Sequence, residues 1–200
     1  MCGITGFLSQ TEIPSKWLER MTSKISHRGP DAQGFFFDEE RKIGLGHRRL
    51  SILDLSIAGN QPMTSPCGNY TIVFNGEVYN YPELKNEFLH DIALQSSSDT
   101  EVVLHCFMKL GPSFVQHLNG MFAFAIYDKQ KATTFIYLDR IGIKPLYYFQ
   151  DKEKFLFGSE LKSIAVLSDE LGKFELNLQA VQQYLRLGYI PAPLTIYNEV

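Results

Sequence analysis

The order of apolar and polar positions along the chain predicts blocks of helix and strand. Over residues 14–26, Trp17, Leu18, Met21 and Ile25 recur on one helical face, which is typical of an amphipathic helix. Similar spacing predicts four more helices, over 81–90, 98–110, 159–167 and 178–187. The second of these has Gly111 directly after it, a residue that commonly ends helices.

Runs of β-branched and aromatic residues bounded by turn residues predict the strands. They lie at 4–8, 69–75, 120–128, 132–138, 145–150 and 154–158. Short connections between consecutive strands indicate hairpins, so the sheets should be mainly antiparallel. Such strands with separate helices favour an α+β layered fold over a doubly wound parallel sheet. The last segment, 188–200, has two prolines and no periodicity, which is typical of a linker.

Composition narrows the class of protein. The chain has 200 residues, 44% of them hydrophobic, and a net charge of −3, which fits one globular domain. Interspersed charges give no basic stripe, so we expect no nucleic-acid partner. The longest apolar run, 121–127, is too short to span a membrane, and no signal peptide is evident, so we expect no membrane partner and a cytoplasmic location. The three cysteines and five histidines show no metal-ligand spacing, which predicts no metal site.

The first residues, MCGITGF, place a cysteine directly after the initiator methionine. Removal of Met1 would leave Cys2 with a free α-amine beside its thiol. The amine has an ordinary pKa of about 7.7–8.0 and the thiol about 8.5, so the amine can act as the base for its own thiol. Alternatively, Cys2 is a small buried apolar residue, and the seven residues alone slightly favour that interpretation.

Seven short motifs follow Cys2 in order. They are HRGPD (27–31), GHRRLSI (46–52), QPM (61–63), FNGEVYN (74–80), SDTEV (98–102), GMFAF (120–124) and DRIGIKPLYY (139–148). Together they resemble the glutaminase domain of class II glutamine amidotransferases, most closely that of glutamine-hydrolysing asparagine synthetases. The resemblance implies an N-terminal-nucleophile hydrolase fold, a four-layer αββα sandwich with two mainly antiparallel sheets.

The resemblance also implies a reaction, the hydrolysis of the glutamine side-chain amide to glutamate and ammonia through a cysteinyl thioester. Cys2 is then the nucleophile, and its α-amine moves the proton. Asn75 and Gly76 match the residues that stabilise the oxyanion. Because Asn-Gly is also a strong hairpin-turn signal, we expect a turn and an oxyanion site together at the end of the strand that precedes them.

Substrate-binding residues are carried over from the same motifs. Arg49 matches the residue for the glutamine α-carboxylate, which a guanidinium can bind through two hydrogen bonds. Its neighbour Arg48 should point to the opposite face, because adjacent side chains alternate in a strand. Glu77 and Asp99 match the residues for the α-ammonium group.

Further residues near these motifs have structural or supporting assignments. Asp99 also lies between Ser98 and Glu101, which fit a helix capping box. Leu50 and Ile52 are expected to line the same pocket, and Arg28 and Asp31 to support it. The segment 139–148 is predicted to be a loop without an assigned role.

Domain organisation follows from the same resemblance. We expect a glutaminase domain over 2–170 and, over 171–200, a helix and linker that lead towards a C-terminal synthetase domain absent from this sequence. No serine-glycine-glycine phosphate loop occurs here, so this domain should need no cofactor. ATP and Mg²⁺ are expected to serve the absent half, which would convert aspartate to asparagine with the ammonia. The expected partners are glutamine and that synthetase domain, and a homodimer stays open.

The sequence leaves three alternatives open. Amidotransferases that form glucosamine phosphate or phosphoribosylamine share the nucleophile but differ where this chain has HRRLSI. A protein similar to asparagine synthetase could amidate another carboxylate acceptor. A glutamine-binding module without turnover is the third alternative, and it would not need Cys2.

Overall fold

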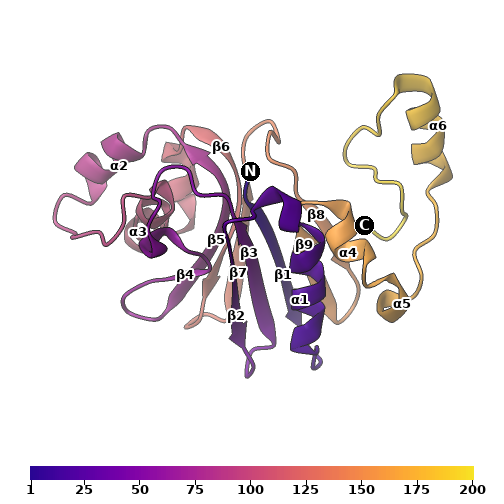
Figure 1. The fold of residues 1–200 in the computed structure, drawn as a ribbon, viewed down its shortest axis with the longest axis horizontal. Helices are drawn as coiled ribbons and strands as arrows, with labels where there is room; N and C mark the ends of the chain where they lie inside the picture. The colour runs from indigo at the N-terminus through magenta and orange to yellow at the C-terminus, as the bar shows by residue number, and fades with distance from the viewer.

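Two antiparallel β-sheets lie face to face in the computed structural model, which describes all 200 residues (Figure 1). One sheet has five strands in the order β2-β3-β1-β9-β8, and the other has four in the order β4-β5-β6-β7. The strands are β1 Gly3–Ser9, β2 Ala32–Asp38, β3 Ile43–Arg49, β4 Met63–Thr64, β5 Tyr70–Val78, β6 Gly120–Asp128, β7 Thr133–Leu138, β8 Tyr147–Gln150 and β9 Lys154–Gly158.

Helices cover the outer face of each sheet, which makes four layers (Figure 1). Helices α1 and α4 pack on the five-stranded sheet, and α3 packs on the four-stranded sheet with α2 beside it. The helices are α1 Ser15–Lys24, α2 Tyr81–Phe88, α3 Asp99–Leu110, α4 Leu161–Ala165, α5 Ser168–Leu171 and α6 Leu178–Leu187. The predicted α+β sandwich is therefore confirmed.

Three apolar clusters fill the spaces between these layers. Ile4, Leu45, Val73 and Tyr127 lie between the two sheets. A larger cluster joins the four-stranded sheet to α2 and α3, and a third joins the five-stranded sheet to α1 and α4. Alternation along each strand explains this arrangement, because every second side chain faces the middle of the sandwich.

Most predicted elements are present, with shifted ends. The predicted strands at 120–128 and 154–158 match β6 and β9 in full. Strands β2, β3 and β4 were not among the predicted ones, and the helix expected over 159–167 is divided into α4 and the following turn. Ser98 caps α3 as predicted, but Glu101 accepts hydrogen bonds from Gln95 and Ser96 rather than from Ser98, so the capping box is only half formed.

The predicted turn at Asn75-Gly76 is wrong. Strand β5 continues through both residues to Val78, and they pair with Ala123 and Phe122 of β6. Gly76 is required for this close pairing, since a Cβ there would lie 2.6 Å from the Phe122 Cα. Pairing with β6, which is distant in sequence, therefore overrides the local turn preference.

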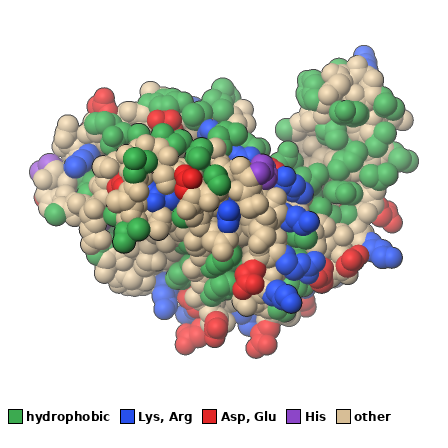
Figure 2. All heavy atoms as spheres, in the orientation of Figure 1, with side chains coloured by type: hydrophobic (Ala, Val, Ile, Leu, Met, Phe, Trp, Pro, Cys, Tyr) green, Lys and Arg blue, Asp and Glu red, His purple; other side chains and the backbone are tan.

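The last residues fold back beside the preceding segment. Leu176 forms a bridge with Tyr197, and the Asn177 N–H donates to the Ile196 carbonyl. Helix α6 stands apart from the sandwich in Figure 1, and hydrophobic side chains gather over it in Figure 2. No helix in the chain has the length and apolar character that a membrane crossing requires.

Candidate active site

Cys2 lies directly before β1, at the end of the sandwich where the N-terminus is marked in Figure 1. It lines a pocket between the five-stranded sheet, the edge of β5 and the start of α3. Seven of the eight predicted site residues line this pocket: Cys2, Arg49, Leu50, Ile52, Gly76, Glu77 and Asp99. The eighth, Asn75, is buried next to Gly76 in β5.

The Cys2 thiol is held by backbone atoms of Leu50. The Leu50 N–H lies 3.4 Å from the sulfur, and the Leu50 carbonyl lies 3.5 Å from it. Burial raises the pKa of the Cys2 thiol, although the Leu50 hydrogen bond and the positive charges of the amino terminus and Arg49 oppose this shift. A thiol in this position is protonated at neutral pH and needs a base before it can attack.

Two predicted supporting residues contact the segments that carry the site. The Arg28 Nε donates to the Cys2 carbonyl at 2.8 Å, and its Nη1 contacts Glu160 at 3.0 Å. Asp31 accepts a hydrogen bond from the Ser51 N–H at 2.8 Å, beside Leu50. Both side chains therefore fix the backbone on either side of the thiol.

Asn75 presents a hydrogen-bond donor that the protein itself does not use. Only 1% of its surface is exposed, and its Nδ2 has no partner. Its side chain is on the same face of β5 as Val73, which packs between the two sheets. Cys2 lies at the edge of this same space between the sheets. A buried donor without a partner is costly, which points to a partner supplied by a ligand.

The Gly76 N–H faces the same pocket from the edge of β5. In an antiparallel strand, the N–H groups of alternate residues point to the same side. The Phe74 N–H donates to Gln61 and the Val78 N–H to Asp99, both away from β6. Gly76 lies between them and beyond the last residue that pairs with β4, so its N–H points to the open edge.

Arg49 and Arg48 take opposite directions, as predicted. Arg49 is buried and lines the pocket, whereas Arg48 donates to Gly29 and Gln33 on the other face of β3. Arg49 donates to the Ser56 carbonyl at 2.7 Å, to Asn60 at 2.7 Å and to the Asp54 carbonyl. Because a guanidinium has five N–H donors, about two stay free for a ligand.

The acidic side of the pocket comes from β5 and the start of α3. Burial raises the pKa of the Asp99 carboxyl, and the nearby charge of Glu77 adds to this, while hydrogen bonds from Val78 and Thr100 oppose it. The Val78 N–H reaches Asp99 at 2.9 Å. Ser98 caps the helix that begins at Asp99, so the carboxylate is held rigidly.

Several pocket residues were not predicted. Gln61, from the QPM motif, accepts from the Phe74 N–H at 2.6 Å and donates to Thr100 at 3.2 Å. Asp54 accepts from Ser56 and Ser97, and these hydrogen bonds hold the pKa of its carboxyl at about 2. The motif itself was a signal for Gln61, whereas nothing local in the sequence indicates the contact between Asp54 and Ser97.

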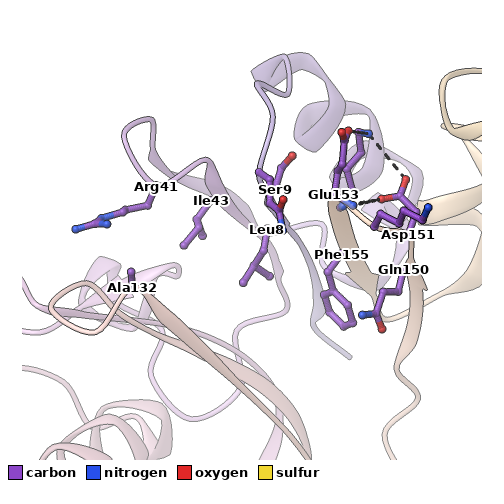
Figure 3. Close-up of a pocket in the computed structure, with 12 residues that line it drawn as sticks. Leu8, Ser9, Arg41, Ile43, Ala132, Gln150, Asp151, Glu153 and Phe155 are labelled. Carbon is purple, nitrogen blue, oxygen red and sulfur yellow. Dashed lines mark hydrogen bonds and ion pairs between the residues drawn. The ribbon is translucent and has the colours of Figure 1, made fainter.

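A larger cavity of about 290 Å³ lies at the opposite end of the sandwich, among the hairpin tips (Figure 3). Leu8, Ile43 and Phe155 form its apolar part, and Lys154 pairs with Asp151 and Glu153 at its rim. It contains none of the predicted site residues. The smaller pocket is therefore the candidate site, because it holds the predicted residues, although the other cavity is larger.

A sandwich of two antiparallel β-sheets between helical layers, with Cys2 directly before a central strand, has the architecture of the N-terminal-nucleophile hydrolase fold. The structure resembles that of glutamine phosphoribosylpyrophosphate amidotransferase from Bacillus subtilis complexed with ADP and GMP, with a TM-score of 0.70 over 84% of this chain and 44% of that chain. At 21% identity, this likeness shows the fold alone. The chain belongs to the glutamine amidotransferase domain family, whose model matches residues 1–200.

The relatives found by sequence include proteins named as asparagine synthetases and as an amidase. A putative asparagine synthetase [glutamine-hydrolyzing] 2 of Methanocaldococcus jannaschii is 42% identical over 99% of this chain and 41% of its own length. Asparagine synthetase [glutamine-hydrolyzing] 1 of Bacillus subtilis is 38% identical over 98% of this chain and 31% of its own. Amidase chry2 of Gibberella zeae is 38% identical over 82% of this chain and 26% of its own. The chain thus spans 26% to 41% of the length of these relatives.

Proposed function

We propose that this chain hydrolyses the side-chain amide of glutamine, with Cys2 as the nucleophile. One observation carries the proposal: the Cys2 thiol shares a pocket with an open backbone edge at Gly76, next to a buried Asn75 amide that has no protein partner. A thiol and unused donors in one pocket are what acyl transfer requires.

The first step needs a base, because burial raises the pKa of the Cys2 thiol. With Met1 removed, the α-amine of Cys2 would take the thiol proton, since its ordinary pKa of about 7.7–8.0 is close to neutral. The sulfur then bonds to the amide carbon of glutamine, and the carbonyl oxygen becomes an oxyanion. Collapse of this intermediate breaks the carbon–nitrogen bond, and the protonated amine returns its proton to the leaving ammonia.

Hydrolysis of the thioester completes the cycle. Water adds to the thioester carbonyl, the carbon–sulfur bond breaks, and glutamate and the free thiol are released. In both steps the oxyanion would accept from the Asn75 Nδ2 and the Gly76 N–H, one from a side chain and one from the backbone. Because these donors are already fixed in β5, they need no rearrangement during the reaction.

Recognition of glutamine is assigned to the charged ends of the pocket. The free donors of Arg49 would bind the α-carboxylate, while Asp99 and Glu77 would bind the α-ammonium group. Leu50 and Ile52 would flank the aliphatic part of the substrate. The three bonds from Arg49 to the segment 54–60 hold its guanidinium in place for this role.

For the whole protein we propose ATP-dependent asparagine formation, with ammonia delivered from this chain to a synthetase half. The names of the relatives and their greater length support this, whereas the relative named as an amidase keeps a different acceptor open. ATP and Mg²⁺ would act in the synthetase half. The apolar face of α6, where Leu185 is 80% exposed, offers a contact surface for the synthetase half. We propose separately that the whole protein can form a homodimer. The predicted cytoplasmic location stays a prediction.

The test is ammonia and glutamate release from glutamine by the purified chain with Met1 removed and without ATP. We expect equimolar products from the wild type and none from Cys2→Ala. Cys106→Ala is the matched control, because Cys106 is buried in α3 and lies in the core rather than in the pocket. Release by Cys2→Ala equal to that of the wild type would refute the proposal.

A further inference from the structure

The proposed reaction joins groups from two different sheets. Cys2 precedes β1 of the five-stranded sheet, whereas Asn75 and Gly76 belong to β5 of the four-stranded sheet. The separation of the nucleophile from the oxyanion donors therefore depends on how firmly the two sheets are held at this end. Between the sheets most contacts are apolar, and these have no directional preference.

The open edge of β5 is held by side chains in place of a neighbouring strand. At Phe74 the N–H donates to the Gln61 Oε1 at 2.6 Å, and the carbonyl accepts from the His47 Nε2 at 3.1 Å. At Val78 the N–H donates to Asp99. Gly76 lies midway between these two fixed points, so its N–H direction is set by them.

His47 links the two sheets at the end that carries Cys2. It is in β3, it pairs in register with Ile4 of β1, and it is fully buried. Since a carbonyl oxygen only accepts, the Nε2 of His47 carries the proton and donates to Phe74. One directional bond thus connects the sheet that carries Cys2 to the residue before Asn75.

Gln61 completes the arrangement from the other side. While its Oε1 holds the Phe74 N–H, its Nε2 donates to the Thr100 Oγ1 in the first turn of α3. The neighbouring residue in that turn is Asp99, which holds Val78. The oxyanion edge and the acidic side of the pocket are therefore joined by one side chain.

We infer that His47 and Gln61 are positioning residues that hold the oxyanion edge of β5 at its working distance from Cys2. Neither touches the reacting atoms in this scheme. The inference rests on the proposed glutamine hydrolysis. It predicts that loss of either side chain weakens stabilisation of the transition state. Loss of His47, which does not line the pocket, should leave glutamine binding by Arg49 and Asp99 in place.

The test compares His47→Leu with two other variants of the same chain. His47→Gln keeps an amide donor, and Tyr127→Phe removes a different hydrogen bond between the sheets, from Tyr127 to Asp38 at 2.8 Å. Asp38 ends β2 at the hairpin end opposite Cys2, so Tyr127→Phe is a matched control for a lost bond between the sheets. The measurements are kcat and KM for glutamine, together with the midpoint of thermal unfolding.

We expect His47→Leu to lower kcat by about 10- to 100-fold, the effect of slightly misplaced donors, with KM within about threefold of wild type. His47→Gln should recover most of kcat, and Tyr127→Phe should lower only the unfolding midpoint. If His47→Leu does not fold, Gln61→Met tests the effect on kcat at the Phe74 N–H, although its KM can also change because Gln61 holds Thr100 beside Asp99. Unchanged kcat in a folded His47→Leu or Gln61→Met protein overturns the inference, whereas an inactive wild type overturns the proposed function instead.

Discussion

Substitution of Asn75 by alanine should lower activity without lowering stability. The Asn75 Nδ2 is buried and has no partner in the folded chain, and such a group costs about 1–3 kcal/mol. Alanine keeps the Cβ, so no apolar atom is lost. We therefore expect the free energy of unfolding of Asn75→Ala to equal that of the wild type or to exceed it by about 1 kcal/mol.

The catalytic effect should have the opposite sign. Loss of one oxyanion donor typically costs about 2.7–4 kcal/mol in the transition state, which corresponds to a fall in kcat of about 10²–10³-fold. KM for glutamine should change little, because the charged ends of the substrate bind elsewhere in the pocket.

Asn80 provides the matched control. Its Nδ2 donates to the His117 carbonyl at 2.9 Å, and its Oδ1 accepts from the Asn119 N–H at 2.9 Å. Asn80→Ala should therefore lose about 1–3 kcal/mol of stability and keep its kcat. Urea unfolding and ammonia release would be measured on both variants. A destabilised Asn75→Ala protein with normal kcat would refute the assignment of Asn75 to the oxyanion.

Three further predictions concern other parts of the site. Arg49→Lys should raise KM for glutamine by about tenfold or more, because lysine keeps the charge but loses the paired donors. Arg48→Lys should change KM little. Equal effects of the two substitutions on KM would contradict the assignment of Arg49 to the α-carboxylate. Burial, with the charges of Arg49 and Arg48, lowers the pKa of His47 to about 3. Between pH 6.5 and pH 3, the His47 imidazole is therefore protonated in the unfolded chain but not in the folded chain. The contribution of neutral His47 to the free energy of unfolding is fully present above pH 6.5 and falls by about 2 kcal/mol on going to pH 5. Urea unfolding should therefore show a smaller dependence of stability on pH for His47→Gln than for the wild type. An extension before Cys2, such as retained Met1, should abolish ammonia release from a folded chain. Mass spectrometry would determine the N-terminal residue of each sample, and an activity assay would measure its ammonia release. Full activity with Met1 retained would contradict the role of the Cys2 α-amine.

Local sequence predicted the architecture well where one strand face or helix face is apolar. The GMFAFAIYD run, which is buried on both faces, forms β6 with the predicted ends, because its aromatic residues and the turn residues on either side favour a strand. The Asn-Gly pair misled the prediction, since pairing of Gly76 with Phe122 outweighed a turn preference that depends only on neighbouring residues. Long-range pairing of this kind is invisible in a local pattern.

The candidate site was predicted through motifs rather than through periodicity. The ordered motifs assign Cys2, Arg49 and Asp99 to one site, and these three residues do line one pocket. The supporting bonds were not predicted. His47 and Phe74 meet across the two sheets, and only the three-dimensional packing places them within 3.1 Å.

An electrophilic glutamine analogue would show whether Cys2 is the nucleophile of a glutamine site. The analogue would be incubated with the chain lacking Met1, and the labelled cysteine would be identified by peptide mapping. We expect label on Cys2 alone, with protection by glutamine, because only this thiol lies in a pocket with groups for the α-amino acid end. Label on the exposed Cys67 or the buried Cys106, or labelling of Cys2 that excess glutamine does not slow, would contradict the assignment.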